Sequence, residues 1–382
     1  MNAAKIIFRY SIMVAILASC IEPYDPQMDN IDTDLLVVDG FLNASEGTAT
    51  VRLTRTLPVK STETIPHVSG ATVRIENDQG LSYPCQQTGE GLYVATGVGI
   101  NFESRYRLVI TTSENREYIS DLVEITQTPP IDSITFSGKD AGVEFAVNAH
   151  DPSGRSRYFR WKYDETYEYN ANFNSLLKFE GEEIVDRPSS ESLYTCWKSD
   201  YSKDIIIGTT KHLTESVVRN APVTVIPKGS IKLSVKYSIL VQQQTLTEEA
   251  YNYWLNLEKS TEDLGGLFDP LPSEVSGNLH SSSDPDEKVI GYFSGGTVEQ
   301  TRLSVNRYEL PRGFQGFTNS NPYCLEDTIF LADLPNIVKE ATWLIQAIAP
   351  PGAPVIGYST APRSCLDCRS YGGSTTPPDF WE

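Results

Sequence analysis

Ala71-Thr72-Val73-Arg74-Ile75-Glu76 alternates small or apolar residues with polar ones, and Thr50-Val51-Arg52-Leu53-Thr54 shows the same pattern earlier in the chain. This period of two is typical of a strand with one face on a core and the other in solvent. Asp78-Gln79-Gly80 and Gly89-Glu90-Gly91 supply turns between such runs. The sequence therefore predicts a β-sandwich, with strands at 35–42, 49–55, 71–77, 82–87, 105–113 and 117–124.

Thr128-Pro129-Pro130 marks the end of this first region. A double proline is stiff and does not fit inside a sheet, so it separates two folding units. We predict a first domain over 35–128 and a second, larger β-rich domain over 131–382. The segments Val68-Ser69-Gly70-Ala71-Thr72-Val73, Gly91-Leu92-Tyr93 and Tyr106-Arg107-Leu108 resemble immunoglobulin-like domains of cell-surface proteins, so the expected class is mainly β with an N-terminal immunoglobulin-like β-sandwich.

The second domain is predicted to contain strands and one or two helices. A capping hydroxyl and two acids at Thr247-Glu248-Glu249 begin a helix that Gly265-Gly266 ends. The stretch 165–199 is aromatic and polar, and we expect an irregular functional loop there. Strands are predicted at 131–137, 143–149, 158–163, 204–209, 231–243, 289–293 and 297–305.

The N-terminal residues indicate export and lipidation. Lys5 and Arg9 precede an apolar stretch over 10–17, which ends in Leu17-Ala18-Ser19-Cys20. This is the pattern of a bacterial lipobox, in which Cys20 takes a diacylglycerol before cleavage and becomes the acylated, palmitate-bearing first residue. Residues 1–19 are thus predicted to be a lipoprotein signal peptide. The alternative is a simple secreted protein whose signal ends near a cysteine.

Residues 20–34 carry five acids, two prolines and no bases, which predicts an extended acidic tether. The stretch also resembles the acidic export signals that send Bacteroidota lipoproteins to the cell surface, and both interpretations stand. The whole chain has 31 basic and 50 acidic residues among 382, a net charge of −19. This balance excludes a nucleic-acid binder that neutralises phosphates, and a polybasic patch for anionic lipids.

Cys196, Cys324, Cys365 and Cys368 are disulfide candidates in an exported chain. Four cysteines allow three pairings, and we expect Cys365 and Cys368 to pin the C-terminal segment to Cys196 and Cys324. Zinc binding and a redox role for Cys365-Leu366-Asp367-Cys368 are the alternatives, but a loop sequence follows this motif. Cys85 is left over and is expected to be a buried thiol.

The search for catalytic motifs finds none. The four histidines, His67, His150, His212 and His280, are far apart in sequence, and no His-Glu-x-x-His, nucleophile elbow or phosphate loop occurs. We therefore expect no catalytic residues, no metal and no cofactor. A hydrolase with an unrecognised pair of carboxylates is the alternative, because any two of the acids can meet in a fold.

Two kinds of surface feature are candidates for function. Asp132-Ser133-Ile134 and Asp327-Thr328-Ile329 resemble the O-glycosylation sequon of exported Bacteroidota proteins, although such tripeptides also occur by chance. Tyrosine and tryptophan form large, rigid contacts at interfaces. The candidate contact surface, which core packing explains equally well, consists of Tyr158, Trp161, Tyr163, Tyr167, Tyr169 and Trp197.

Motifs of the second domain carry a wider resemblance: Tyr194-Thr195-Cys196-Trp197, Gly291-Tyr292-Phe293, Cys365-Leu366-Asp367-Cys368-Arg369, and residues 204–207, 232–239, 248–254, 267–270, 372–373 and 378–381. By them the chain resembles a Bacteroidota family of outer-membrane lipoproteins with a large domain of unknown function, commonly encoded beside TonB-dependent receptors. The resemblance covers nearly the whole mature chain and supplies no catalytic residues. It implies an outer-membrane, surface-exposed lipoprotein, and a TonB-dependent receptor as partner. We expect a non-enzymatic accessory or ligand-capture protein, with a structural or adhesive envelope protein as the alternative.

Overall fold

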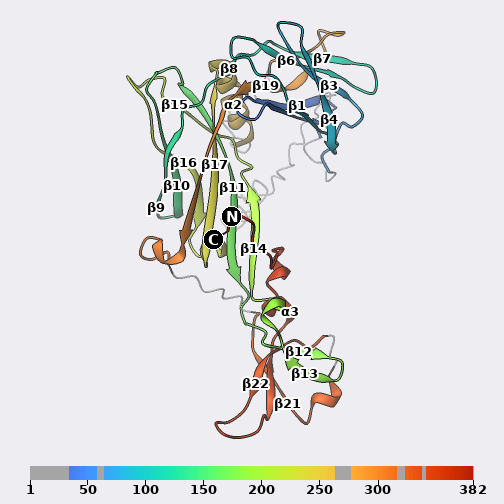
Figure 1. Cartoon of the computed structure of the whole chain (residues 1–382), viewed down its shortest axis with the longest axis vertical. Coiled ribbons are helices and arrows are strands. Elements are labelled where there is room, and N and C mark those ends of the chain that lie inside the picture. Colours follow the sequence, from blue (N-terminus) through green and yellow to red (C-terminus); the bar gives the residue numbers. More distant parts are fainter. Residues whose placement is uncertain (1–33, 58–63, 263–276, 316–322, 338–340, 382) are drawn as a thin grey trace, which may run out of the picture.

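The computed structural model describes residues 34–57, 64–262, 277–315, 323–337 and 341–381. Over these residues the chain is mainly β, which confirms the predicted fold class. Figure 1 shows three parts along the long axis: a curled sheet at one end, a sandwich of two sheets in the middle, and a small module at the other end.

The first part is a sheet that encloses its own core. Its strands follow in the order β18-β7-β6-β3-β4-β5-β2-β1-β19-β8, and apolar side chains from both halves form one cluster that includes Val38, Val51, Ile75 and Leu108. The immunoglobulin-like topology itself stays a prediction. The strands taken from the N-terminal region are β1 (Leu36–Asn43), β2 (Thr48–Arg55), β3 (Thr72–Asn77), β4 (Ser82–Gly89), β5 (Leu92–Thr96), β6 (Tyr106–Thr111), β7 (Glu117–Ser120) and β8 (Ile125–Thr126).

Two strands of this sheet come from far along the chain. β18 (Leu279–Ser281) pairs antiparallel with β7, and β19 (Val289–Gly296) lies between β1 and β8, parallel to both. Phe293 of β19 is fully buried in the first core. The sheet predicted from residues 35–128 is therefore completed by residues that follow the helix.

At Gly291 the backbone of β19 leaves no room for a side chain next to β1. Its φ is +148°, and a Cβ built on it would lie 2.1 Å from the carbonyl oxygen of Val38. We expect Gly291→Ala to lower the free energy of unfolding by about 3 kcal/mol or more, since a backbone clash adds to the conformational strain.

Gly97→Ala is the matched control for Gly291→Ala. Gly97 also has a positive φ, of +69°, but a Cβ there meets nothing within 4 Å. It should lose only the conformational term of about 1–2 kcal/mol. Urea denaturation of both variants measures the difference, and equal losses would show that the contact with Val38 is not tight.

The central sandwich has a separate core between two sheets. β9 (Ile131–Gly138), β10 (Gly142–Asp151) and β16 (Ser216–Pro227) form one sheet in the order β16-β10-β9. The other sheet has the order β14-β11-β17-β20, and a short strand also pairs with β11. Its strands are β11 (Tyr158–Asn170), β14 (Thr195–Tyr201), β15 (Ile206–Thr209), β17 (Lys236–Leu246) and β20 (Val298–Asn306).

The prediction of an irregular loop over 165–199 is wrong. β11 continues to Asn170, β14 begins at Thr195, and between them β12 (Leu177–Glu180) and β13 (Glu183–Asp186) form a hairpin. In β11 aromatic residues, which favour strands, alternate with charged residues. The mixture has the same composition as a polar loop, and composition alone therefore led to the wrong prediction.

The predicted helix is confirmed as α2 (Glu248–Glu262). The Thr247 hydroxyl accepts a hydrogen bond from the Ala250 N–H at 3.2 Å, as a helix N-cap does. Its buried face, with Tyr253 and Trp254, packs on Tyr292 of β19. The predicted end at Gly265-Gly266 lies outside the described residues. The short helices are α3 (Arg363–Leu366), η1 (Ser189–Glu191), η2 (Ile231–Leu233), η3 (Arg307–Glu309), η4 (Leu334–Asn336) and η5 (Cys368–Tyr371).

The distal module consists of the β12–β13 hairpin, α3 and three strands in the order β21-β23-β22. These strands are β21 (Asp327–Phe330), β22 (Leu344–Ile348) and β23 (Gly357–Thr360). Its small core includes Ile345, Ala361 and Leu366. No helix in the described residues is long and apolar enough to span a bilayer.

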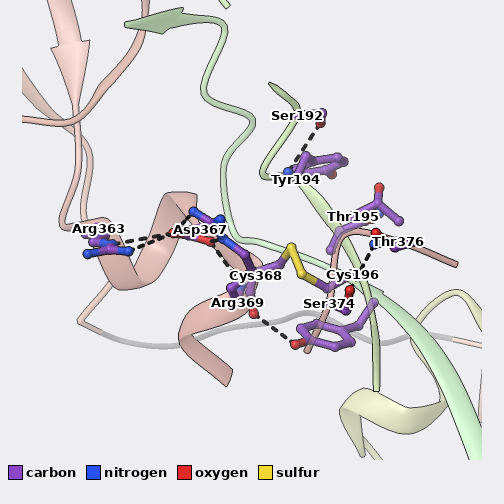
Figure 2. The surroundings of a disulfide bond; sticks show 12 residues. Ser192, Tyr194, Thr195, Cys196, Arg363, Asp367, Cys368, Arg369, Ser374 and Thr376 are labelled. Carbon is purple, nitrogen blue, oxygen red and sulfur yellow. Dashed lines mark hydrogen bonds and ion pairs between the residues drawn. A yellow bond between two sulfur atoms is a disulfide. The ribbon is translucent and has the colours of Figure 1, made fainter. Parts of the chain in front are cut away.

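Two disulfides tie the C-terminal segment to the rest of the molecule. Cys196 bonds Cys368 and Cys324 bonds Cys365, so the expected pinning is confirmed and one of the three pairings is selected. Figure 2 shows Cys196–Cys368 beside Asp367, which is buried and accepts a hydrogen bond from Nε of Arg369 at 2.8 Å.

Candidate functional site

β11 has two faces of opposite character. Its odd-numbered residues, such as Phe159, Trp161, Tyr167 and Tyr169, are buried in the sandwich core. Its even-numbered residues point to the other side of the sheet, because successive side chains of a strand alternate. Between Tyr158 and Asn170 at the strand ends, these residues are Arg160, Lys162, Asp164, Thr166 and Glu168. A charged and polar face therefore lies opposite an aromatic one.

Neighbouring strands extend this polar face. In the register of the sheet Lys162 pairs with Gln242 of β17, and Gln242 pairs with Gln300 of β20. The next row contains Arg160 and Gln244. We call these five side chains the polar face.

A cleft of about 350 Å³ separates the polar face from the outer face of β1 and β2. The core side of β1 is formed by even-numbered residues, so its odd-numbered residues face the cleft. Ligand sites commonly occur where two folding units meet. The lining from the first sheet is Asp39, Phe41, Asn43, Glu46, Thr48, Thr50 and Arg52.

The two walls of the cleft are joined by buried hydrogen bonds at the predicted domain boundary. The hydroxyl of Thr128 accepts from the Thr245 N–H at 2.9 Å and donates to the Thr297 carbonyl at 2.6 Å. The carbonyl of Pro129 accepts from Nε2 of Gln243 at 2.8 Å. The double proline is thus fastened to β17, and this holds the two sheets at a fixed separation.

Lys162 and Arg160 are cations without an ion-pair partner among the described residues. Burial lowers the pKa of the Lys162 ammonium, and the adjacent Arg160 guanidinium lowers it further. Burial also lowers the pKa of Arg160, whereas the Asp39 carboxylate acts in the opposite direction. The Arg160 guanidinium carbon lies 3.5 Å from the ring centroid of Trp254, so the guanidinium packs against the indole. An unpaired cation removed from water favours an anionic ligand.

The C-terminal residues cover another part of the same sheet face, around Glu168 and Arg302. Nε1 of Trp381 donates to Oε2 of Glu168 at 3.0 Å. The Arg302 guanidinium carbon lies 3.7 Å from the ring centroid of Phe380, and burial lowers the pKa of Arg302. The cleft near Lys162 is therefore the part of this sheet face that stays open to a ligand.

A second buried charge lies inside the sandwich core and is fully partnered. Glu165 is 2% exposed, forms an ion pair with Lys232, and accepts a hydrogen bond from the Tyr237 hydroxyl at 2.8 Å. Burial and this carboxylate raise the pKa of Tyr237 well above its ordinary value. Because Glu165 is buried and both of its carboxylate oxygens have partners, we assign it a structural role.

The cleft is lined by hydrogen-bonding and charged side chains. Its lining has amides, hydroxyls, two cations and the carboxylates of Asp39 and Glu46, but neither histidine nor cysteine. No group of acidic, histidine and cysteine side chains suited to a metal ion occurs in the described part of the chain.

The aromatic contact surface predicted from sequence is wrong for three of its members, because Trp161, Tyr167 and Tyr169 belong to the core. The remaining three are half-buried. The Tyr163 hydroxyl donates to Thr224, Tyr158 packs against Tyr251, and Trp197 forms a two-residue bridge with Ser374. The residues that sequence reasoning missed are Arg160 and Lys162, whose signal was their alternation with those aromatics.

The remaining predicted positions are placed as follows. Ser133 and Thr328 are exposed on the edge strands β9 and β21, and their glycosylation stays a prediction. Cys20 lies outside the described residues. Cys85 is free, as expected, but it is half-buried rather than fully buried.

Burial raises the pKa of the Cys85 thiol from 9.0 to about 11. At pH 8 the thiolate fraction should therefore be roughly a hundredfold lower in the folded protein than in the unfolded chain. We expect iodoacetamide to alkylate Cys85 about a hundredfold faster in urea than in buffer, since only the thiolate reacts. The folded-state rate should keep rising as the pH increases beyond 9. A folded-state rate that levels off near pH 9 would contradict the shift.

The fold defines a mainly β, disulfide-pinned protein with a polar cleft between two of its sheets. The chain belongs to the family described as "Domain of unknown function (DUF4249)", whose model matches residues 21–302. A search of curated proteins finds no match. One similar solved chain comes from a structure described as "Complete structure of manganese lipoxygenase of Gaeumannomyces graminis and partial structure of zonadhesin of Komagataella pastoris". It is 10% identical, covers 58% of this chain and 91% of that chain, and has a TM-score of 0.16, which is too low to bear on function.

Proposed function

We propose that this protein is a non-enzymatic ligand-capture lipoprotein of the outer membrane. In this proposal it faces the cell surface and delivers its ligand to a TonB-dependent transporter. The observation that carries the capture role is the cleft, where Lys162 lies without an ion-pair partner among the described residues and Arg160 occupies the adjacent row of the sheet. The lipobox at Cys20 and the acidic stretch 20–34 support the location, and the family resemblance supports the transporter partner.

The cleft favours capture over a purely structural or adhesive role. Two partly desolvated cations without ion-pair partners lower the stability of the folded protein unless a ligand neutralises them. A structural or adhesive protein would have no use for this cost, whereas a ligand-capture protein would. The distal module adds a surface of the kind that partner proteins contact. Its exposed large apolar side chains are Leu176, Tyr323, Leu325, Phe330, Leu331 and Ile356.

Co-purification tests the partnership. The full-length tagged protein is purified from outer membranes solubilised in a mild detergent, with cells that carry the untagged protein as the control. We expect a β-barrel transporter in stoichiometric amount. Absence of a transporter under gentle conditions would contradict the partnership, and recovery of other envelope components in its place would favour the structural alternative.

Protease treatment of intact cells tests the surface location. Proteinase K should degrade the protein while periplasmic markers stay intact. Full protection in intact cells, followed by degradation after lysis, would place the protein on the periplasmic side.

A further inference from the structure

We propose that the cleft binds a small acidic sugar of the hexuronate class, with its single carboxylate on Lys162 and its hydroxyls on the amide side chains around it. This inference rests on the proposed capture function and names its ligand. It is drawn from the charge, the hydrogen-bonding groups and the size of the cleft.

The charges of the cleft call for a ligand with one negative charge. Asp39, Glu46 and Arg52 line the cleft from the first sheet and Lys162 lines it from the polar face, so the lining itself is balanced. Arg160 lies in the adjacent row on one side of Lys162 and Asp164 lies in the row on the other side, so these two charges offset each other, and the Lys162 ammonium is left without an ion-pair partner among the described residues. A ligand with several negative charges would be repelled by the two carboxylates, whereas a neutral ligand would leave the Lys162 ammonium unpaired.

The hydrogen-bonding groups call for a ligand with many hydroxyls. Asn43, Gln242, Gln244 and Gln300 present carboxamides from both walls, and Thr48 and Thr50 add hydroxyls. A carboxamide both donates and accepts, as a sugar hydroxyl does, so the two match without a net charge. Inorganic phosphate offers mainly acceptor oxygens, so it would leave the carbonyl oxygens of the carboxamides without donors.

The size and shape of the site agree with one sugar unit. A volume of about 350 Å³ is near the lower end of the range for small-molecule sites. Phe41 is half-buried in the wall from β1 and offers an apolar surface to the C–H face of a sugar ring. Both walls are strands of sheets, which position side chains more firmly than loops do.

Calorimetric titration of the purified, folded protein tests the inference with four probes. Glucuronate supplies the carboxylate and the hydroxyls, glucose the hydroxyls alone, and acetate and inorganic phosphate the charge alone. We expect glucuronate to bind at least about tenfold more tightly than each of the others, the loss typical of removing one charge-assisted hydrogen bond. Equal affinity for glucuronate and glucose, phosphate as the tightest probe, or no binding of glucuronate would each overturn the inference.

Two variants assign the effect to the polar face. Lys162→Met should weaken glucuronate binding at least about tenfold and leave the thermal unfolding temperature unchanged or higher, because it removes a desolvated charge. Gln300→Glu changes an exposed residue to an isosteric acid, which should pair with Lys162 and exclude the ligand carboxylate. Lys203→Met, at an exposed lysine outside the cleft, is the matched control and should bind as the wild type does. Full glucuronate affinity in either cleft variant would overturn the assignment.

The outcome is separable from the proposed function. A transporter that co-purifies, together with a cleft that ignores glucuronate, would reject the sugar and leave capture in place. Glucuronate binding without a transporter would support the ligand and reject the partnership.

Discussion

Replacing both Cys196 and Cys368 with alanine should lower the free energy of unfolding by about 5 kcal/mol, because this disulfide closes a loop across 172 residues. Its loss also releases the tail that covers the lower part of the sheet. In the intact protein the Tyr169 hydroxyl donates to the Cys368 carbonyl at 2.8 Å. Urea denaturation of the oxidised protein, followed by tryptophan fluorescence, measures the stability loss.

The pair Cys324→Ala and Cys365→Ala is the matched comparison. That disulfide spans 41 residues, so its removal should cost about 4 kcal/mol and loosen the distal module instead of the tail. Carboxypeptidase digestion separates the two, since only the first pair should free Phe380 and Trp381 from their contacts with Arg302 and Glu168. A tail that stays resistant in the first pair would show that side-chain contacts alone hold it.

Replacing Cys20 with alanine should move the whole protein from the membrane fraction to the soluble fraction. The proposed anchor consists of acyl chains, each methylene contributing about 0.8 kcal/mol of membrane affinity. The measurement is the distribution of the protein between membrane pellet and supernatant after lysis. Cys85→Ala is the control and should stay with the membranes. Unchanged sedimentation of the Cys20 variant would contradict the lipobox.

Local sequence patterns predicted much of the fold. Alternation identified β2 and β3, and the capping hydroxyl of Thr247 marked the start of α2. The insertion of β19 beside β1 could not be predicted, because a pairing between residues 36–43 and 289–296 leaves no trace in either segment alone. Gly291 is a local sign of close backbone approach, but a glycine alone does not show which distant strand it contacts.

The candidate site was harder to predict than the fold. Aromatic residues in β11 attracted attention because such residues serve both cores and interfaces, and composition cannot separate the two uses. Core residues and cleft residues of β11 differ in the face of the strand that they occupy. Arg160 and Lys162 share a face with Gln244 and Gln242 only through the register of β11 with β17. That register is fixed by tertiary pairing and has no signature in a single strand.

The parallel pairing of β1 with β19 constrains the order in which the chain can fold. Synthesis, and the export proposed above, both proceed from the N-terminus onward, so the first strands are free to fold long before residues 289–296. Until then the hydrogen-bonding edge of β1 has no partner and can pair with another chain. The predicted first domain, residues 35–128, should therefore aggregate when it is expressed by itself. In the proposed export, chaperones that shield strand edges should matter most before residues 289–296 have been translocated.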